Sequence, residues 1–274
     1  DWVVFCRNAG QANRVICGMM KTVVLSNDKI HTGTLLLVNA RCPMKYENKK
    51  GLLPANINFP DIRLDRDAAN ALQFVLEKIS AKDKIIPVSG YRSVNEQTEI
   101  YNNSLKENGE TFTKKFVALP NRSEHQTGLA IDLALNEEEI DFICPKFPYD
   151  GICDDFRQTA YNYGFIERSP KNKESITGIS HEPWHFRYVG YPHSKIIQQK
   201  GICFEEYISF VKNYRYDCKL TFMQENGKVI EIFYVPARND KIEIAIPDNC
   251  IYNVSGNNID GLIVTIWRKD DDEK

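Results

Sequence analysis

The sequence lacks the marks of several large protein classes. No apolar run approaches the roughly 18–20 residues that a membrane-spanning helix needs. No run of five basic residues occurs, and the formal net charge of −2 gives no sign of nucleic-acid binding. No P-loop and no dinucleotide-type glycine run is present. We therefore expect neither a membrane span nor a nucleic-acid partner, and the 42% hydrophobic and 26% charged residues are typical of an ordinary globular protein.

Cysteine is present but shows no pattern of pairing. None of the eight cysteines forms a Cys-x-x-Cys pair, so the sequence gives no sign of a structural zinc knuckle. A chain of 274 residues can build an adequate core without disulfides, and no secretory leader is visible. We expect reduced cysteines and a cytoplasmic location.

The composition along the chain predicts three parts. Residues 1–24 are predicted to form an N-terminal extension. We interpret residues 1–19 as either an upstream extension or a non-native remnant, because Met19-Met20-Lys21 resembles a true start. Residues 25–202 hold every candidate site residue. Residues 203–274 are predicted to be a helix followed by a small antiparallel β unit, in which Asn226-Gly227 is a strong hairpin signal.

Hydrophobic periodicity and turn residues predict a mixture of helices and strands. Helices are expected at 66–80, 93–109, 136–143, 154–163, 192–200 and 204–214. Strands are expected at 34–38, 84–88, 129–135, 165–168, 185–189, 217–223, 228–235, 241–246 and 262–268, and a loop at 41–60. Ser93 and Glu96 match a capping box, which places Arg92 at a junction between a strand and a helix.

Two short segments carry the residues of one candidate zinc site. The first is Ser-Glu-His-Gln-Thr-Gly-Leu-Ala-Ile-Asp, from Ser123 to Asp132, and the second is Glu-Pro-Trp-His-Phe, from Glu182 to Phe186. Together they offer two imidazoles, one carboxylate ligand and a second carboxylate that could serve as a base. Three protein ligands with an open position are typical of catalytic zinc, whereas structural zinc has four.

The second segment also satisfies the expression His-Glu-x-x-His, because His181 precedes Glu182. In its helical form this motif would make His181 and His185 ligands and Glu182 the base. Pro183 argues against that form, since proline inside a helix costs about 3 kcal/mol. We therefore predict a turn that leads into a strand, in which Glu182 and His185 converge without His181.

These motifs resemble those of the D-Ala-D-Ala metallopeptidases, the VanX, VanY and VanXY peptidases of vancomycin resistance. The matching segments are Ser-Gly-Tyr-Arg-Ser at Ser89–Ser93, Ser-Glu-His-x-x-Gly-x-Ala-x-Asp at Ser123–Asp132 and Glu-x-Trp-His-Phe at Glu182–Phe186. Their order and spacing match across roughly residues 25–200, and the added tail is most similar to the bifunctional VanXY peptidases of the VanG type. The resemblance implies an α+β fold, with a small central antiparallel sheet flanked by helices and a C-terminal antiparallel β extension.

The resemblance also implies a role for each site residue. One zinc ion per chain would be held by His125, Asp132 and His185, with Glu182 as the catalytic base. Arg92 would stabilise the oxyanion at the scissile carbonyl. The substrate's C-terminal carboxylate would be held by Gln97 and Ser123, although an exposed helix glutamine and a loop serine are also common without such a role.

The implied substrates are the D-Ala-D-Ala dipeptide, a peptidoglycan precursor that ends in it, or both. Hydrolysis would remove the group that vancomycin binds and so confer resistance. Two alternatives stay open at this point: a zinc-containing module that binds cell-wall peptide without cutting it, and an endopeptidase that cuts peptidoglycan crosslinks. The segment 106–121 is a candidate for the loop that caps the pocket, or else a plain surface connection.

Overall fold

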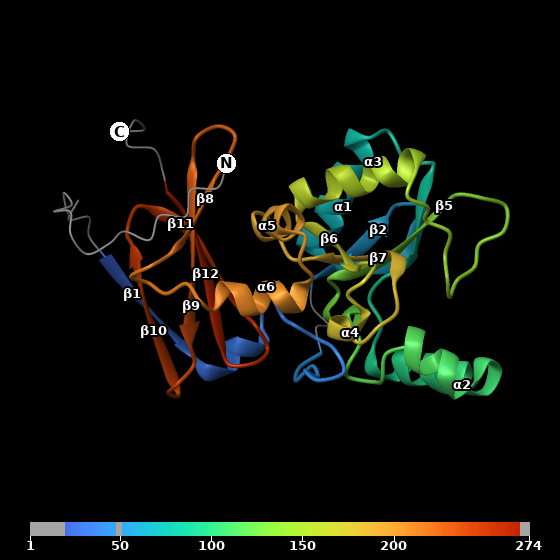
Figure 1. The fold of residues 1–274 in the computed structure, drawn as a ribbon, viewed down its shortest axis with the longest axis horizontal. Coiled ribbons are helices and arrows are strands. Elements are labelled where there is room, and N and C mark those ends of the chain that lie inside the picture. The colour runs from blue at the N-terminus through green and yellow to red at the C-terminus, as the bar shows by residue number, and fades with distance from the viewer. Residues whose placement is uncertain (1–19, 48–50, 269–274) are drawn as a thin grey trace. The chain divides into compact units, whose positions relative to one another are not determined.

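The computed structural model describes residues 20–47 and 51–268, which form two compact units (Figure 1). The central unit runs from Val38 to Glu205, and the β unit combines residues up to Leu37 with those from Glu206 onward. Residues 1–19, which the sequence analysis interprets as an upstream extension or a non-native remnant, lie outside the described residues. The domain boundaries of the sequence analysis stay a prediction.

The central unit is built on a four-stranded antiparallel sheet with the strand order β4-β5-β7-β6. A separate hairpin of β2 and β3 packs against α1. The strands of the central unit are β2 (Leu52–Asn56), β3 (Phe59–Asp65), β4 (Ile85–Ser89), β5 (Ala130–Leu135), β6 (Phe165–Ser169) and β7 (Glu182–Tyr188). Its helices are α1 (Arg66–Lys78), α2 (Val94–Phe116), α3 (Gly151–Ala160), α4 (Glu174–Thr177) and α5 (His193–Lys200), with 3-10 turns η2 (Glu124–Thr127) and η3 (Tyr161–Tyr163).

The two faces of this sheet have different surroundings because side chains alternate along a strand. Leu129, Ile131 and Leu133 belong to the main hydrophobic core, together with buried residues of α1 and α3. Asp132, between them, lines a pocket on the opposite face, to which α2 also contributes residues. Figure 1 shows α1 and α3 on one side of the sheet and α2 on the other. The strand predicted at residues 129–135 is confirmed.

The β unit has its own small core. Strand β1 (Met20–Ser26) pairs with β10 (Lys241–Pro247), and a four-stranded sheet has the order β11-β12-β9-β8. The remaining elements are 3-10 turn η1 (Asn27–His31), β8 (Leu220–Met223), β9 (Val229–Pro236), β11 (Cys250–Gly256) and β12 (Gly261–Arg268). Helix α6 (Phe204–Val211) begins in the central unit and ends in this one. The expected hairpin at Asn226-Gly227 joins β8 and β9.

The α+β class with antiparallel sheets is confirmed, but the helix predicted at 136–143 is wrong. This segment is irregular, and the Asp141 carboxylate accepts hydrogen bonds from the backbone of Ile143 and Cys144. Phe142 is 75% exposed and Ile143 46% exposed, so the segment buries no apolar face. A short helix without such a face gains too little from packing to form.

The strand predicted at 34–38 and the continuous loop predicted at 41–60 are also wrong. Leu35, Leu36 and Leu37 are all buried, so the segment lacks the alternation of a half-buried strand, and its backbone bonds to Ser255 and Asn257 rather than to a ladder. The loop contains β2, where Pro54 lies beside a bulge in a two-stranded sheet, as expected for proline in a strand. In the described part of the chain, no helix is long and apolar enough to cross a membrane.

Candidate active site

The central sheet brings His125, Asp132 and His185 together from two distant parts of the sequence. Asp132 on β5 lies directly opposite His185 on β7 in the strand register. His125 lies on η2, which ends at Gly128 in the left-handed region (φ +75°) before the chain enters β5. A residue without Cβ suits this turn. The seven-residue spacing of His125 and Asp132 thus spans a turn and the start of a strand.

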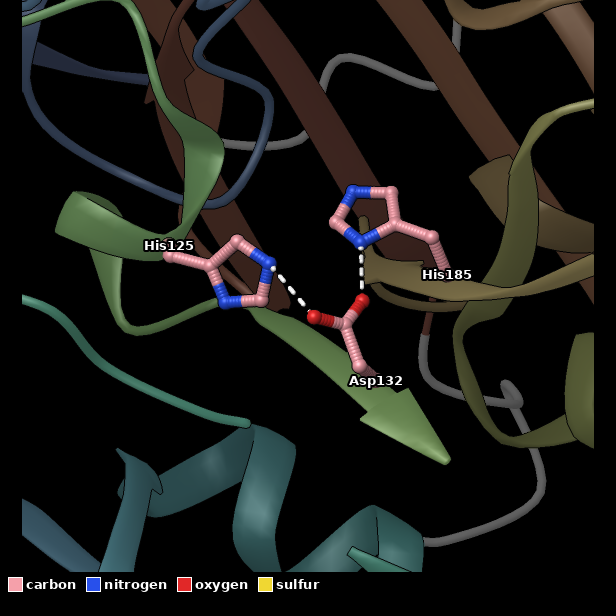
Figure 2. A group of neighbouring side chains, drawn as sticks. All are labelled: His125, Asp132 and His185. Atoms are coloured by element: carbon pink, nitrogen blue, oxygen red, sulfur yellow. Dashed lines mark hydrogen bonds and ion pairs between the residues drawn. The ribbon is translucent and has the colours of Figure 1, made fainter. Parts of the chain in front are cut away.

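Both imidazoles face the Asp132 carboxylate (Figure 2). His185 Nδ1 lies 2.7 Å from Asp132 Oδ1, and His125 Nε2 lies 3.2 Å from Asp132 Oδ2. One potential ligand atom from each of the three residues falls within 4.8 Å of the others. The side chains are largely buried, with 4%, 9% and 7% of His125, Asp132 and His185 exposed. The group could therefore hold a metal ion.

The surroundings shift the pKa values of the three side chains in this group in different directions. Burial and the nearby Arg92 charge lower the pKa of His125 to about 4, so this imidazole is neutral at neutral pH. Burial alone would raise the pKa of Asp132, but the two histidines outweigh it and hold that pKa below its ordinary value. For His185, burial opposes protonation, yet the Asp132 carboxylate raises its pKa. Metal ligands must be deprotonated, so a proton on His185 competes with a metal ion.

Glu182 stands at the start of β7 and lines the same pocket as the three ligand candidates. Only 8% of this residue is exposed. Burial and the negative charge of Asp132 raise its pKa to about 7, against the opposing charges of His185 and Arg92. A carboxyl group with a pKa near neutrality can both accept and return a proton. The strand form predicted for this segment is confirmed, because β7 begins at Glu182 itself.

Arg92 also points into the site, from the loop between β4 and α2. Its Nη2 lies 3.5 Å from Asp132 Oδ2, and its Nη1 donates to Gln97 Oε1 at 3.0 Å. The Arg92 Nε is buried and makes no hydrogen bond within the described residues. The predicted capping box of Ser93 and Glu96 is present and fixes the start of α2. One guanidinium group is thus aimed at the site with a donor still unused.

The pocket has a volume of about 310 Å³ and is partly open to solvent. Gln97 and Ser123 both line it, as do Lys114 and residues 116–119 from the second half of segment 106–121. Gln97 is fully buried, and its Nε2 donates to the Ala118 carbonyl at 2.7 Å. Its amide oxygen accepts from Arg92, so one amide hydrogen is left for a bound molecule.

His181 does not join the group. Its Nε2 lies 2.6 Å from Tyr149 Oη and 3.5 Å from Glu167 Oε1, and its ring stacks on Tyr149. The literal His-Glu-x-x-His reading therefore does not describe this site.

The sequence analysis missed a set of buried ionic side chains next to the group. Glu124 precedes His125, and Arg187 follows His185 by two residues on β7. The two-residue period of a strand places Arg187 on the same face as His185, which is the signal that could have found it. Glu124 lies 2.9 Å from both Arg168 and Arg187.

A buried His/Asp/His group beside a carboxylate and an arginine, all lining one pocket, defines a metallopeptidase. The model of the VanY family, D-alanyl-D-alanine carboxypeptidase, matches residues 61–191. The bifunctional D-Ala-D-Ala dipeptidase and carboxypeptidase VanXYC of Enterococcus gallinarum is 44% identical over 180 residues, which span 65% of this chain and 95% of that protein. The chain belongs to the VanY family of D-alanyl-D-alanine peptidases.

Two solved structures extend the comparison. The vancomycin resistance D,D-dipeptidase VanXYg, in complex with a D-Ala-D-Ala phosphinate analogue, matches with a TM-score of 0.90 and 62% identity. The match covers 92% of this chain and all of that one. A VanY D,D-pentapeptidase from the VanB-type resistance cassette, in complex with Zn(II), matches with a TM-score of 0.53 and 30% identity over 64% of this chain and 98% of that one. The predicted family is confirmed.

Proposed function

We propose that this protein is a zinc-dependent D,D-peptidase that hydrolyses the D-Ala-D-Ala dipeptide and removes the terminal D-alanine from peptidoglycan precursors. The observation that carries the proposal is the convergence of Glu182, Arg92 and the His125–Asp132–His185 group on one pocket. Loss of the D-Ala-D-Ala terminus removes the target of vancomycin, so the biological result is resistance.

The donor set fits zinc. Two imidazoles and one carboxylate are among the commonest ligand sets of catalytic zinc, and three protein ligands leave a position open. We propose that His125 Nε2, His185 Nδ1 and the Asp132 carboxylate hold one ion per chain, because these atoms already face one another. When bound, zinc supplies a Lewis acid and lowers the pKa of the attacking water.

Glu182 is the proposed general base. It accepts a proton from the attacking water and returns it to the amine that leaves with the terminal D-alanine. Its buried position supports both transfers, because burial raises the pKa of its carboxyl group to about 7. The carboxylate thus takes up and releases a proton near neutral pH.

Arg92 is the proposed partner of the oxyanion. Its position in the pocket beside Asp132 would place a fixed cation where negative charge develops on the scissile carbonyl. Gln97 holds one Arg92 nitrogen in place. We propose that the remaining Gln97 amide hydrogen and the Ser123 hydroxyl hold the free carboxylate of the terminal D-alanine.

The test is release of D-alanine from the free dipeptide and from the pentapeptide precursor, each with and without a chelator. We expect release from both substrates, loss on chelation and recovery when zinc is restored. Binding of the peptides without release would instead identify a binding module, and cleavage of crosslinked peptidoglycan alone would identify an endopeptidase. The cytoplasmic location stays a prediction, which fractionation of native cells tests.

A further inference from the structure

Next to the proposed zinc ligands lies a cluster of four ionic side chains, three of them buried and one half-buried, here called the buried ion cluster. It consists of Glu124, Arg168, Arg187 and Glu205. Arg168 donates from Nε to Glu124 Oε1 at 2.9 Å, and its two terminal nitrogens donate to the Glu205 carboxylate at 3.0 and 2.6 Å. Arg187 Nη1 lies 2.9 Å from the same Glu124 oxygen. Both arginines therefore contact the same oxygen of Glu124, Oε1.

The second oxygen of Glu124 is the unusual atom. Glu124 Oε2 is buried and has no hydrogen-bond partner in the described part of the chain. A buried carboxylate oxygen without a donor is costly, so such atoms need a specific explanation. The group that Oε2 faces is the ring of His185, whose Nε2 lies 4.0 Å away.

Each of the two proposed histidine ligands has an outer ring nitrogen that is turned away from Asp132 and has an acceptor nearby. His125 directs Nε2 to Asp132 and donates from Nδ1 to the Gly90 carbonyl at 2.6 Å. His185 directs Nδ1 to Asp132 (Figure 2). Its Nε2 therefore lies on the side of Glu124, 4.0 Å from Oε2. Histidines that bind a metal generally donate their other ring N–H to a carboxylate or a carbonyl, which fixes the tautomer and the ring orientation.

We propose that Glu124 is a positioning residue that accepts the Nε2–H of His185 and so keeps Nδ1 unprotonated and aimed at the metal. The inference rests on the proposed role of His185 as a zinc ligand. Glu124 acts on the reaction only through His185. Arg168 and Arg187 hold Oε1, so Oε2 is the oxygen that remains for the imidazole.

The variant that tests this is Glu124→Gln, with Glu205→Gln as its matched control. In Glu124→Gln, the two arginines would keep the amide oxygen where Oε1 now lies. The amide NH₂ would then face the N–H of His185, so that one donor meets another. Glu205→Gln also removes a carboxylate charge from this cluster. That carboxylate pairs with Arg168 and lies away from His185. Zinc affinity is measured by competition with a chromogenic chelator, and this measurement does not depend on catalytic activity.

We expect Glu124→Gln to weaken zinc binding by about 10- to 100-fold, the usual effect of losing such a partner. We expect Glu205→Gln to leave zinc affinity within about twofold of the original protein, since it does not face the metal site. Unchanged affinity in Glu124→Gln, or an equal loss in both variants, would overturn the proposal and leave Glu124 a purely structural ion-pair partner. If the original protein itself takes up no zinc, the proposed function fails rather than this inference.

A second measurement needs no variant. In the zinc-loaded protein with ¹⁵N-labelled histidine, we expect NMR to show the His185 proton on Nε2 and protected from exchange with solvent. A proton on Nδ1, or exchange at the rate of a solvent-exposed ring, would overturn the proposal even if Glu124→Gln did not fold.

Discussion

At the scale of single residues, the site is organised around the Asp132 carboxylate. Its two oxygens face one imidazole each, at 2.7 and 3.2 Å, and Arg92 lies 3.5 Å from one of them. An ionised carboxylate in a buried position needs such partners. In the proposed function, the same arrangement would offer a divalent ion one carboxylate and two imidazole ligands.

Glu182→Gln tests the proposed base directly. The amide has nearly the same size but cannot accept the proton of the attacking water. We expect D-alanine release to fall by about 10²- to 10⁴-fold, the usual contribution of general base catalysis. Zinc content per chain, measured in parallel, should stay unchanged because Glu182 is not one of the proposed ligands. Retained activity would show that another group is the base.

The pH dependence of catalysis should report the same residue. Glu182 must be ionised to accept a proton, and its pKa is raised to about 7 by burial. We expect kcat/KM to fall tenfold per pH unit below an apparent pKa at or somewhat below this value, since a bound cation favours the ionised form. The measurement is kcat/KM from pH 5 to 8, with zinc occupancy checked at each point. A flat profile at full occupancy would contradict this assignment.

At the scale of elements, strongly patterned segments were predictable from sequence and irregular ones were not. The periodic apolar residues of α1, the capping box of α2 and the alternation in β5 each encode their structure locally. The hairpin β2–β3 was missed because Pro54 and the surrounding asparagines are typical of loops. Strands β1 and β11 were also missed.

The residues of the candidate site were likewise predictable only in part. Its residues were found from the chemistry of two short motifs and from a family resemblance, and the structure brings them together. Glu124 was not found, because its ion pairs with Arg168 and Arg187 depend on tertiary contacts that no local pattern reveals. Arg187 was overlooked, although its position two residues after His185 on the same strand was a usable signal. The contacts of Gln97 with Arg92 and Ala118 are also tertiary and could not be predicted.

The kink in α2 gives a prediction at this scale. Gly109 has φ +79° and ψ 170°, and a methyl group added to its Cα would meet no atom within 4 Å. Gly109→Ala would therefore act through backbone strain alone, and we expect a loss of about 1–3 kcal/mol in the free energy of unfolding. Denaturant unfolding measures it, and Lys106→Ala, at an exposed position of the same helix, is the matched control with an effect within about 0.5 kcal/mol. Equal stability of the two variants would contradict the positive-φ kink.

At the scale of the whole molecule, all proposed catalytic and ligand residues lie in the central unit, Val38–Glu205. The relative VanXYC aligns over 95% of its own length while covering only 65% of this chain. That relative, named for both peptidase activities, thus has little sequence beyond the part that matches this chain.

We therefore expect a shortened chain of residues 38–211, which ends with α6, to bind zinc with the affinity of the full chain. Residue 211 is chosen because Glu205, in the first turn of α6, pairs with Arg168. The check is zinc affinity and dipeptide hydrolysis of the shortened and full chains side by side, with folding confirmed by circular dichroism. A folded short chain that no longer binds zinc would show that the β unit contributes to the site.

The most direct test of the central claim is anomalous X-ray diffraction at the zinc absorption edge from crystals of the zinc-loaded protein. We predict one peak per chain, within about 2.0–2.2 Å of His125 Nε2, Asp132 and His185 Nδ1, with no fourth protein ligand. A peak elsewhere, or a fourth protein atom bound to the ion, would contradict the assignment of this group as a catalytic zinc site.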